Sequence, residues 1–386
     1  MSEIKKMIER LCPDGVEYKK LGEVLDYEQP SKYIVSSKDY LGEGIPVLTA
    51  GQTFILGYTD EDTGIYRASK EKPVIIFDDF TTSFHWVTFD FKVKSSAMKM
   101  LRPINNDINF RFIYYAMKCI KYETADHARQ WISKYSLFEI PVPPIEVQSK
   151  IVEILDNFTE LEAELEAELE ARRKQYEYYR NQLLTFDKVG GGVRFDVKWM
   201  TLGEIGYYVR DRIDGSMLTA DNYIGVENIL KDKQGKTTAT SVPSSNAIAY
   251  TDGDILIGNI RPYLKKIWMA DRKGGTNGDV LCIRIFDKDI ITPHYLYCVL
   301  SSDEFFNYDN SHSKGGKMPR GDKKAVLEYT FPIPPLSEQQ RIVDILDRFE
   351  ALTTDLQSGL PAEIEARRKQ YEYYREKLLT FKRKSA

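Results

Sequence analysis

Basic side chains gather in two segments of the second half of the chain. One is IRPYLKKIWMADRK at residues 260–273, and the other is SHSKGGKMPRGDKK at residues 311–324. Lys and Arg bind the phosphates of nucleic acids, and glycine gives the second segment the flexibility to reach them. A basic loop is often only solvated surface, but two such loops in one block favour nucleic-acid contact. The candidates here are Arg261, Tyr263, Lys265, Lys266, Lys314, Lys317 and Arg320.

The first half of the chain carries a weaker version of this pattern. TTSFHWVTFDFKVK at residues 81–94 alternates as a strand does, and HARQWISK at residues 127–134 reads as a loop. Arg and Gln can make paired hydrogen bonds to guanine and adenine edges, so these residue types suit base readout. The tryptophans of both segments are more typical of a core than of a contact surface. The candidates are Lys92, Lys94, Arg129, Gln130 and Lys134.

No segment has the pattern of a catalytic or cofactor site. The proline pairs stand in Val-Pro-Pro-Ile and Ile-Pro-Pro-Leu, without the Asn or Asp and the aromatic residue of an amino-methyltransferase. No GxxxxGK[ST] loop offers an ATP site, and Gly190–Gly192 reads as a linker. Asp78 and Asp79 lack the Glu-x-Lys of a nuclease, and the four His and four Cys lack metal-ligand spacing. We expect no catalytic residue, no cofactor and no metal on this chain.

A long internal repeat frames these blocks. EARRKQYEYYR occurs at Glu170–Arg180 and returns letter for letter at Glu365–Arg375. Upstream, IPVPPIEVQSKIVEILDNF at residues 140–158 reappears as FPIPPLSEQQRIVDILDRF at residues 331–349. A match of this length indicates two copies of one structural unit, each beginning at a proline pair.

Both copies have the apolar spacing of a helix. Such a long helix needs a partner, and the second copy is the obvious one, which predicts an antiparallel, coiled-coil-like pair. LEAE tetrads fill the first copy, whereas the second is four residues longer and contains Gly359 and Pro361. The proline is expected to break or kink the second helix. The apolar stripe of the first helix is Ile151, Leu155, Phe158, Leu161, Leu165, Leu169, Tyr176, Leu183 and Phe186, and that of the second is Leu352, Leu356, Leu360, Ile364, Tyr371, Leu378 and Phe381.

Polar residues of the repeated block are also the same in both copies. Packing of the apolar stripe does not require this identity, so we interpret it as two matching surfaces for matching partners. The predicted partner-binding residues are Arg172, Arg173, Tyr176 and Arg180 in the first copy, and Arg367, Arg368, Tyr371 and Arg375 in the second.

Length and landmarks suggest the domain plan. A chain of 386 residues suits two or three domains. We expect a globular domain at residues 1–144, a helix at 145–186, a second globular domain at 187–335 and a C-terminal helix at 336–381. LGEV at Leu21–Val24 matches LGEI at Leu202–Ile205, and Tyr18 stands where Trp199 does. The predicted class is α+β, with two pseudo-symmetric mixed α/β domains separated by the helices, and strands at 74–77, 86–93, 254–257 and 280–285.

Charge and hydropathy limit the location and the partners. The net charge is −4, but the acidic residues concentrate between Glu160 and Glu170, so the loops can still be basic. No apolar run approaches the length of a membrane span, and the charged and polar segment Met1–Arg10 is not typical of a signal peptide. We expect a cytoplasmic protein with no membrane contact.

The chain resembles the specificity subunits of type I restriction-modification systems over essentially its whole length. The two proline-led helices with their ARRKQYEYYR blocks look like that family's conserved regions. GIPVLTAGQTFILGYTDE at residues 44–61 and DILIGNIRPYLKKIWMADRKGGTNGDVLCIR at residues 254–284 are similar to its recognition sequences. The resemblance implies a non-catalytic subunit in which each target-recognition domain binds one half of a bipartite site in double-stranded DNA. Because the two domains differ, the two half-sites are expected to differ.

The resemblance also implies the partners and their cofactors. The helices would separate the recognition domains and dock two methyltransferase subunits, and restriction subunits could join them. S-adenosylmethionine, ATP and Mg²⁺ would then bind the partners and not this chain. The LEAE tetrads look like the family's short repeats, whose number sets the spacer between half-sites. One alternative is a coiled-coil scaffolding protein whose globular domains bind protein, and another is a methyltransferase that binds S-adenosylmethionine itself.

Overall fold

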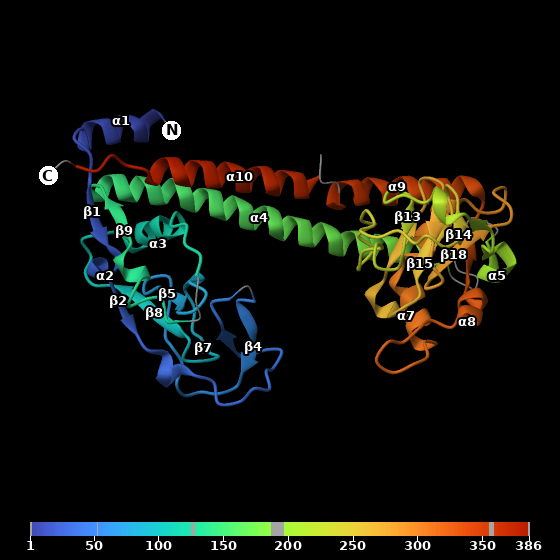
Figure 1. Cartoon of the computed structure of the whole chain (residues 1–386), viewed down its shortest axis with the longest axis horizontal. Helices are drawn as coiled ribbons and strands as arrows, with labels where there is room; N and C mark the ends of the chain where they lie inside the picture. The colour runs from blue at the N-terminus through green and yellow to red at the C-terminus, as the bar shows by residue number, and fades with distance from the viewer. Residues whose placement is uncertain (1, 52, 125–127, 187–196, 355–358, 385–386) are drawn as a thin grey trace. The chain divides into compact units, whose positions relative to one another are not determined.

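Contacts divide the chain into two compact units. The computed structural model describes residues 2–51, 53–124, 128–186, 197–354 and 359–384 (Figure 1). The first unit joins residues 1–164 to 365–386, and the second covers residues 165–364. The boundaries between these units fall within the long helices. The predicted domain plan treats the helices as separate segments, and it stays a prediction. The predicted linker Gly190–Gly192 lies outside the described residues.

The described residues of the first unit form three small sheets. Strand order is β2-β8-β5-β6 in an antiparallel sheet, β4-β3-β7 in a mixed sheet and β1-β9 in an antiparallel pair. The strand predicted at residues 86–93 is wrong, because two short strands on different sheets occupy this stretch. The elements are α1 (Ser2–Leu11), β1 (Glu17–Lys20), α2 (Leu21–Val24), β2 (Leu25–Glu28), η1 (Pro30–Tyr33), β3 (Ile45–Leu48), β4 (Ile55–Thr59), β5 (Val74–Asp78), β6 (Phe84–Val87), β7 (Lys92–Val93), β8 (Met98–Pro103), α3 (Phe110–Lys118), η2 (Tyr135–Leu137) and β9 (Glu139–Val142).

The second unit repeats this plan. Its sheets have the orders β11-β18-β15-β16, β12-β14-β17-β13 and β10-β19. The strands predicted at 254–257 and 280–285 correspond to β15 and β18. The elements are β10 (Lys198–Thr201), α5 (Leu202–Ile205), β11 (Gly206–Tyr208), β12 (Arg212–Ile213), η3 (Gly215–Met217), β13 (Tyr223–Ile224), β14 (Ala247–Tyr250), β15 (Ile255–Gly258), η4 (Pro262–Leu264), β16 (Ile267–Met269), β17 (Gly274–Thr276), β18 (Val280–Ile285), α6 (Pro293–Leu300), α7 (Asp303–Ser311), α8 (Lys323–Glu328) and β19 (Thr330–Ile333).

The LGE landmarks form the same local structure in both units. Glu23 accepts the backbone N–H of Lys20 at 3.0 Å, and Glu204 accepts that of Thr201 at 2.6 Å, so each glutamate caps the one-turn helix that it belongs to. The preceding strands also pair alike, since Tyr18 lies opposite Pro141 and Trp199 opposite Pro332. The shared landmarks therefore mark equivalent positions of a repeated frame.

A buried glutamine attaches each proline-led helix to its domain. Gln148 accepts the backbone N–H of Asn109, the N-cap of α3, at 2.8 Å and donates to the carbonyl of Pro143 at 2.7 Å. Gln339 accepts the N–H of Thr292, the N-cap of α6, at 2.9 Å and donates to Pro334 at 2.9 Å. A satisfied buried amide fixes one geometry, so this contact sets the direction in which each helix leaves its domain.

Helix α4 (Ile145–Leu184) is a single helix of 40 residues. Ile151 and Leu155 are fully buried in the core of the first unit, as the apolar stripe predicts. Leu161 is 44% exposed, so the stripe does not stay covered through the LEAE tetrads. A leucine at every fourth residue advances about 40° per tetrad around the helix, which turns the tetrad leucines progressively away from one contact line.

The described residues of the second repeat form α9 (Leu336–Thr354) and α10 (Leu360–Leu379). Pro361 is the second residue of α10, where its missing N–H costs no helix hydrogen bond. Residues 355–358, including the stripe residue Leu356, lie outside the described residues. In the first unit α10 pairs with α4 in antiparallel direction, since Phe158 stacks on Tyr374 at 5.5 Å and Glu162 pairs with Arg368.

Candidate nucleic-acid interface

The two basic segments of the second domain meet in space. Ile260 and Arg320 form a β-bridge, Arg261 donates its backbone N–H to the carbonyl of Pro319 at 2.7 Å, and Gly321 donates to Asn259 at 3.2 Å. A second bridge between Lys314 and Arg320 closes the loop. Two loops that are separate in the sequence thus become one surface, which the sequence alone does not reveal.

Four of the predicted contact residues are exposed on this surface. Tyr263 stands at the tip of η4, and Lys314, Lys317 and Arg320 are exposed along the second loop. Lys314 pairs with Asp322, and Arg320 lies 3.2 Å from Asp279. These pairs are on the surface and worth little, so both cations can turn to a phosphate at small cost.

Arg261 and the two lysines after η4 have different environments. The half-buried Arg261 has a buried Nε without a hydrogen-bond partner. The ammonium of Lys265 lies 2.8 Å from Asp303, and Lys266 donates to the carbonyl of Val226 at 2.7 Å. Burial also lowers the pKa of Lys266. Lys265 and Lys266 are thus bound within the domain, and we no longer expect them to touch DNA.

Two of the predicted contacts in the first domain lie inside it. Lys92 is buried, pairs with Glu61 at 2.6 Å and donates to the carbonyl of Thr63 at 2.8 Å. Gln130 is buried and donates to the carbonyl of Ala128 at 2.7 Å. Direct contact of either side chain with DNA is therefore excluded in this conformation. Lys94 and Arg129 are exposed and Lys134 is half-buried, so these three remain predictions.

An anchor that sequence reasoning missed holds the loop of Arg129. Asp79 accepts the backbone N–H of Trp131 through its carboxylate at 2.8 Å, and its carbonyl accepts that of Gln130 at 2.8 Å. Lys99 lies 3.2 Å from the same carboxylate, and both members of this ion pair are buried. Asp79 therefore positions the loop of Arg129, and no local sequence pattern predicts its pairing with the distant Lys99.

The first tyrosine and the last arginine of the repeated block point inward. Arg180 is only 1% exposed and lies over the ring of Tyr176 at 5.1 Å, while Arg375 lies over Tyr371 at 5.3 Å. Tyr176 and Tyr371 pack against the cores of their units. Arg180 is too buried to contact a partner, so the prediction is wrong for this residue, whereas partner binding by Tyr176, Tyr371 and Arg375 stays a prediction.

Outward residues of the block are repeated as well. Lys174 and Lys369 are exposed, and Tyr178 and Tyr373 are each 58% exposed. Arg172 and Arg367 are half-buried, whereas Arg173 and Arg368 are exposed. The sequence prediction missed the two exposed tyrosines, although their helical spacing of four residues from Lys174 and Lys369 places them on one face.

A buried carboxylate lies beneath the junction of the two basic loops. Asp309 of α7 is 1% exposed, and neither of its carboxylate oxygens has a hydrogen-bond donor. The side-chain oxygen of the buried Asn259 also lacks a donor. A Cβ at Gly321 would come within 2.3 Å of Asp309 and 2.8 Å of Asn259, so both oxygens converge on this glycine. Burial raises the pKa of Asp309 to about 6.

The described residues offer no metal centre and no membrane helix. Within these residues, no three His, Cys, Asp or Glu side chains gather closely enough to hold a metal ion. The four cysteines are free thiols. No helix in the described part of the chain combines the length and the apolar composition needed to cross a bilayer.

Comparisons with known proteins agree with this architecture. The family described as "Type I restriction modification DNA specificity domain" matches residues 13–171 and again residues 196–366. The Escherichia coli protein named "Type I restriction enzyme EcoR124I/EcoR124II specificity subunit" is 41% identical, over 99% of this chain and 98% of that protein.

Solved structures share the fold at low sequence identity. The type I restriction-modification S subunit from M. genitalium has a TM-score of 0.53 at 16% identity, covering 95% of this chain and 96% of that one. A chain from a structural study of type I system assembly and conformational transition has a TM-score of 0.57 at 15% identity, covering 95% and 98%. The Escherichia coli relative is named a specificity subunit and not a coiled-coil scaffold, which sets the scaffold alternative aside. The chain therefore belongs to the family of type I restriction-modification DNA specificity subunits, and it recognises DNA sequence with two domains.

Proposed function

We propose that each domain of this chain reads one half of an asymmetric, bipartite site in double-stranded DNA. The observation that carries the proposal is that two equivalent frames support unlike loops. The frames share their capped LGE turns and their glutamine-anchored helices, whereas η4 and the loop of Arg320 bring basic residues together in the second domain. Equivalent frames with different loops are expected to read different bases.

The proposed DNA contacts are the exposed members of the predicted set. In the second domain these are Tyr263, Lys314, Lys317 and Arg320, with Arg261 beside them, and in the first domain Lys94, Arg129 and Lys134. Phosphate contacts give affinity that falls steeply with salt, whereas base contacts give specificity. Alanine at Lys317 should therefore weaken binding to all duplexes and lower the salt dependence.

The proposed partners are two methyltransferase subunits, docked on the two copies of one helix face. Glu170, Lys174 and Tyr178 form that face in the first copy, and Glu365, Lys369 and Tyr373 repeat it in the second. An exposed tyrosine is well suited to a binding hot spot. Arg172, Arg173, Arg367 and Arg368 belong to the same repeated block and remain candidates for this docking.

We infer that the chain itself carries no chemistry. S-adenosylmethionine would bind the methyltransferase subunits, and ATP with Mg²⁺ would bind restriction subunits where these join. The complex is expected to work in the cytoplasm, on DNA. Binding of S-adenosylmethionine by the isolated chain would contradict this division of roles and favour the methyltransferase alternative.

A methylation map tests the proposal directly. DNA from cells that express this chain with its methyltransferase subunit is compared with DNA from cells that express the methyltransferase alone. Methylated adenine in a split motif with two unlike halves, seen only when this chain is present, is the expected result. A palindromic motif would contradict the asymmetry, and the absence of any new motif despite a stable complex would contradict DNA reading.

A further inference from the structure

The turn that carries Arg261 and Tyr263 is held in an unfavourable backbone conformation. Arg261 and Lys265, which flank η4, have φ of 55° and 48°, in the left-handed region that side chains other than glycine adopt at a cost. Such residues keep this conformation only where their surroundings impose it. The contacts that impose it therefore decide where the recognition side chains point.

A second turn with the same strain supports the first. Asp232 and Lys233 also have positive φ, of 53° and 63°. Asp232 donates its backbone N–H to the carbonyl of Leu264 at 2.9 Å, and Lys233 donates to that of Lys265 at 3.0 Å. Two strained turns are thus joined by two backbone hydrogen bonds, one of them donated by Lys233 itself.

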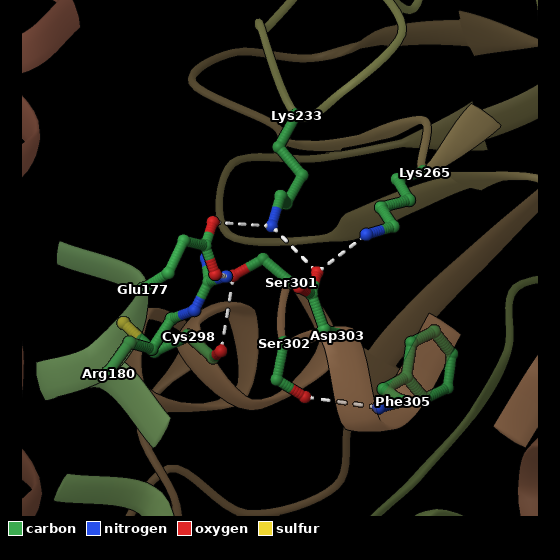
Figure 2. A network of polar contacts seen from close by, with 9 residues as sticks. All are labelled: Glu177, Arg180, Lys233, Lys265, Cys298, Ser301, Ser302, Asp303 and Phe305. Carbon is green, nitrogen blue, oxygen red and sulfur yellow. Dashed lines mark hydrogen bonds and ion pairs between the residues drawn. The ribbon is translucent and has the colours of Figure 1, made fainter. Parts of the chain in front are cut away.

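Side-chain charges connect Lys233 to two helices. Figure 2 shows its ammonium between Glu177 of α4, at 2.8 Å, and Asp303 of α7, at 3.2 Å. Asp303 also accepts from Lys265 at 2.8 Å. Only 14% of the Lys233 side chain is exposed, so this alternation of negative and positive charges is partly shielded from water and salt.

The residue of α4 that Lys233 contacts belongs to the repeated block. Glu177 pairs with the buried Arg180, and both belong to the sequence that recurs at Glu365–Arg375. The counterpart of Glu177 in the other copy is Glu372, which is exposed on α10 and makes no ion pair with a described residue. The link from the common helix to a recognition turn is thus a specific feature of the second unit among the described residues.

We propose that Lys233 and Asp303 are positioning residues for the second half-site, which fix the η4 turn relative to α4 and so set which bases Arg261 and Tyr263 reach. This inference rests on the proposed function. Neither residue touches DNA, and Lys265, whose ammonium is bound to Asp303, has the same positioning role. Loss of the link should therefore relax the choice of bases without removing a phosphate contact.

The test uses the full chain in complex with its methyltransferase partner. Lys233→Met keeps the aliphatic stem and removes both ion pairs, Lys233→Arg keeps the charge, and Lys231→Met changes an exposed lysine of the same loop as the matched control. Adenine methylation is mapped over a random-sequence duplex library, and binding to selected duplexes is measured against salt. The wild-type map defines both half-sites before any variant is compared.

Lys233→Met should lower discrimination between bases at the second half-site by about tenfold, which is the scale of one mismatched base pair. Discrimination at the first half-site and the dependence of DNA affinity on salt should not change. Lys233→Arg and Lys231→Met should behave as wild type. Asp303→Asn should relax the same half-site, as an independent variant. Wild-type discrimination in both Lys233→Met and Asp303→Asn would overturn the proposal, as would a lowered salt slope, which would mean that Lys233 binds phosphate directly. A wild-type complex without any sequence preference would instead refute the proposed function itself.

Discussion

Replacing Asp309 with asparagine should stabilise the second unit at neutral pH. Burial raises the pKa of this carboxyl from its ordinary value of 3.8 to about 6, against the opposing positive charge of His312. The charged form has no hydrogen-bond donor, whereas a neutral acid can donate its proton to a nearby acceptor such as the unpaired oxygen of Asn259. An asparagine has nearly the same shape and can donate in the same way at every pH.

The magnitude follows from linkage between protonation and folding. A shift of about two pKa units corresponds to about 3 kcal/mol of unfolding free energy. Because the folded pKa of Asp309 is the higher one, stability from its protonated form is complete below 3.8 and is lost as the pH rises through about 6. The Asp309→Asn variant should therefore gain up to about 3 kcal/mol over wild type above pH 6, and the gap should close toward pH 4.

Hydrogen exchange of α7, measured from pH 5 to pH 8, reports the difference in stability between wild type and Asp309→Asn. The exchange rates are first corrected for the intrinsic pH dependence of exchange. Asp322→Asn is the matched control, because the pKa of Asp322 is lowered by the Lys314 ammonium and by backbone N–H groups. Its charged form stabilises the fold above its ordinary pKa, so neutralising Asp322 should weaken protection at neutral pH. A difference between wild type and Asp309→Asn that stays constant between pH 5 and pH 8 would refute the reasoning, since Asp309 would then not titrate in that interval.

Three further changes test other parts of the structure. Lys99→Met leaves Asp79 as an unpaired buried charge, so it should lower the unfolding free energy by about 3–5 kcal/mol and expose the N–H of Trp131 to fast exchange. Unchanged stability and exchange would contradict the ion pair. Gln148→Leu leaves a buried backbone N–H unpaired and should lower the unfolding free energy by about 1–3 kcal/mol in a urea titration, and unchanged stability would contradict the anchor. Tyr178→Ala should change stability by less than about 0.5 kcal/mol but weaken methyltransferase binding by calorimetry about thirtyfold, and unaltered binding would remove this face as the docking site.

The sequence predicted the frame well because repetition and periodicity carry that information. The proline pairs, the LGE turns and strands such as β15 and β18 all follow from local patterns that recur or alternate. The strand predicted at 86–93 failed because alternation does not reveal that a chain leaves one sheet and enters another. β6 pairs with β5, whereas β7 pairs with β3, and the residues between them belong to neither sheet.

Site residues were harder to predict because side-chain direction depends on distant partners. Lys92 and Lys94 have the same charge and lie two residues apart, yet Lys92 is buried in an ion pair with Glu61 whereas Lys94 is exposed. Gln130 lies beside the exposed Arg129 and is buried. The sequence supplies the right types of residue, but the long-range contacts that select among them are formed only in the folded domain.

The repeated block shows why identity between copies does not by itself indicate a binding surface. Its inward residues, such as Tyr176 and Arg180, are the same in both copies because both pack on the same frame. Its outward residue Tyr178 is 58% exposed, so packing does not explain the repetition at this position, and a duplicated partner is the cause that we propose. Glu177 lies between these two faces and, in the second unit alone among the described residues, reaches Lys233 of a recognition turn. Under the proposed function, one helix serves core packing, methyltransferase docking and the positioning of a reading turn, and substitutions a single residue apart should separate these three effects.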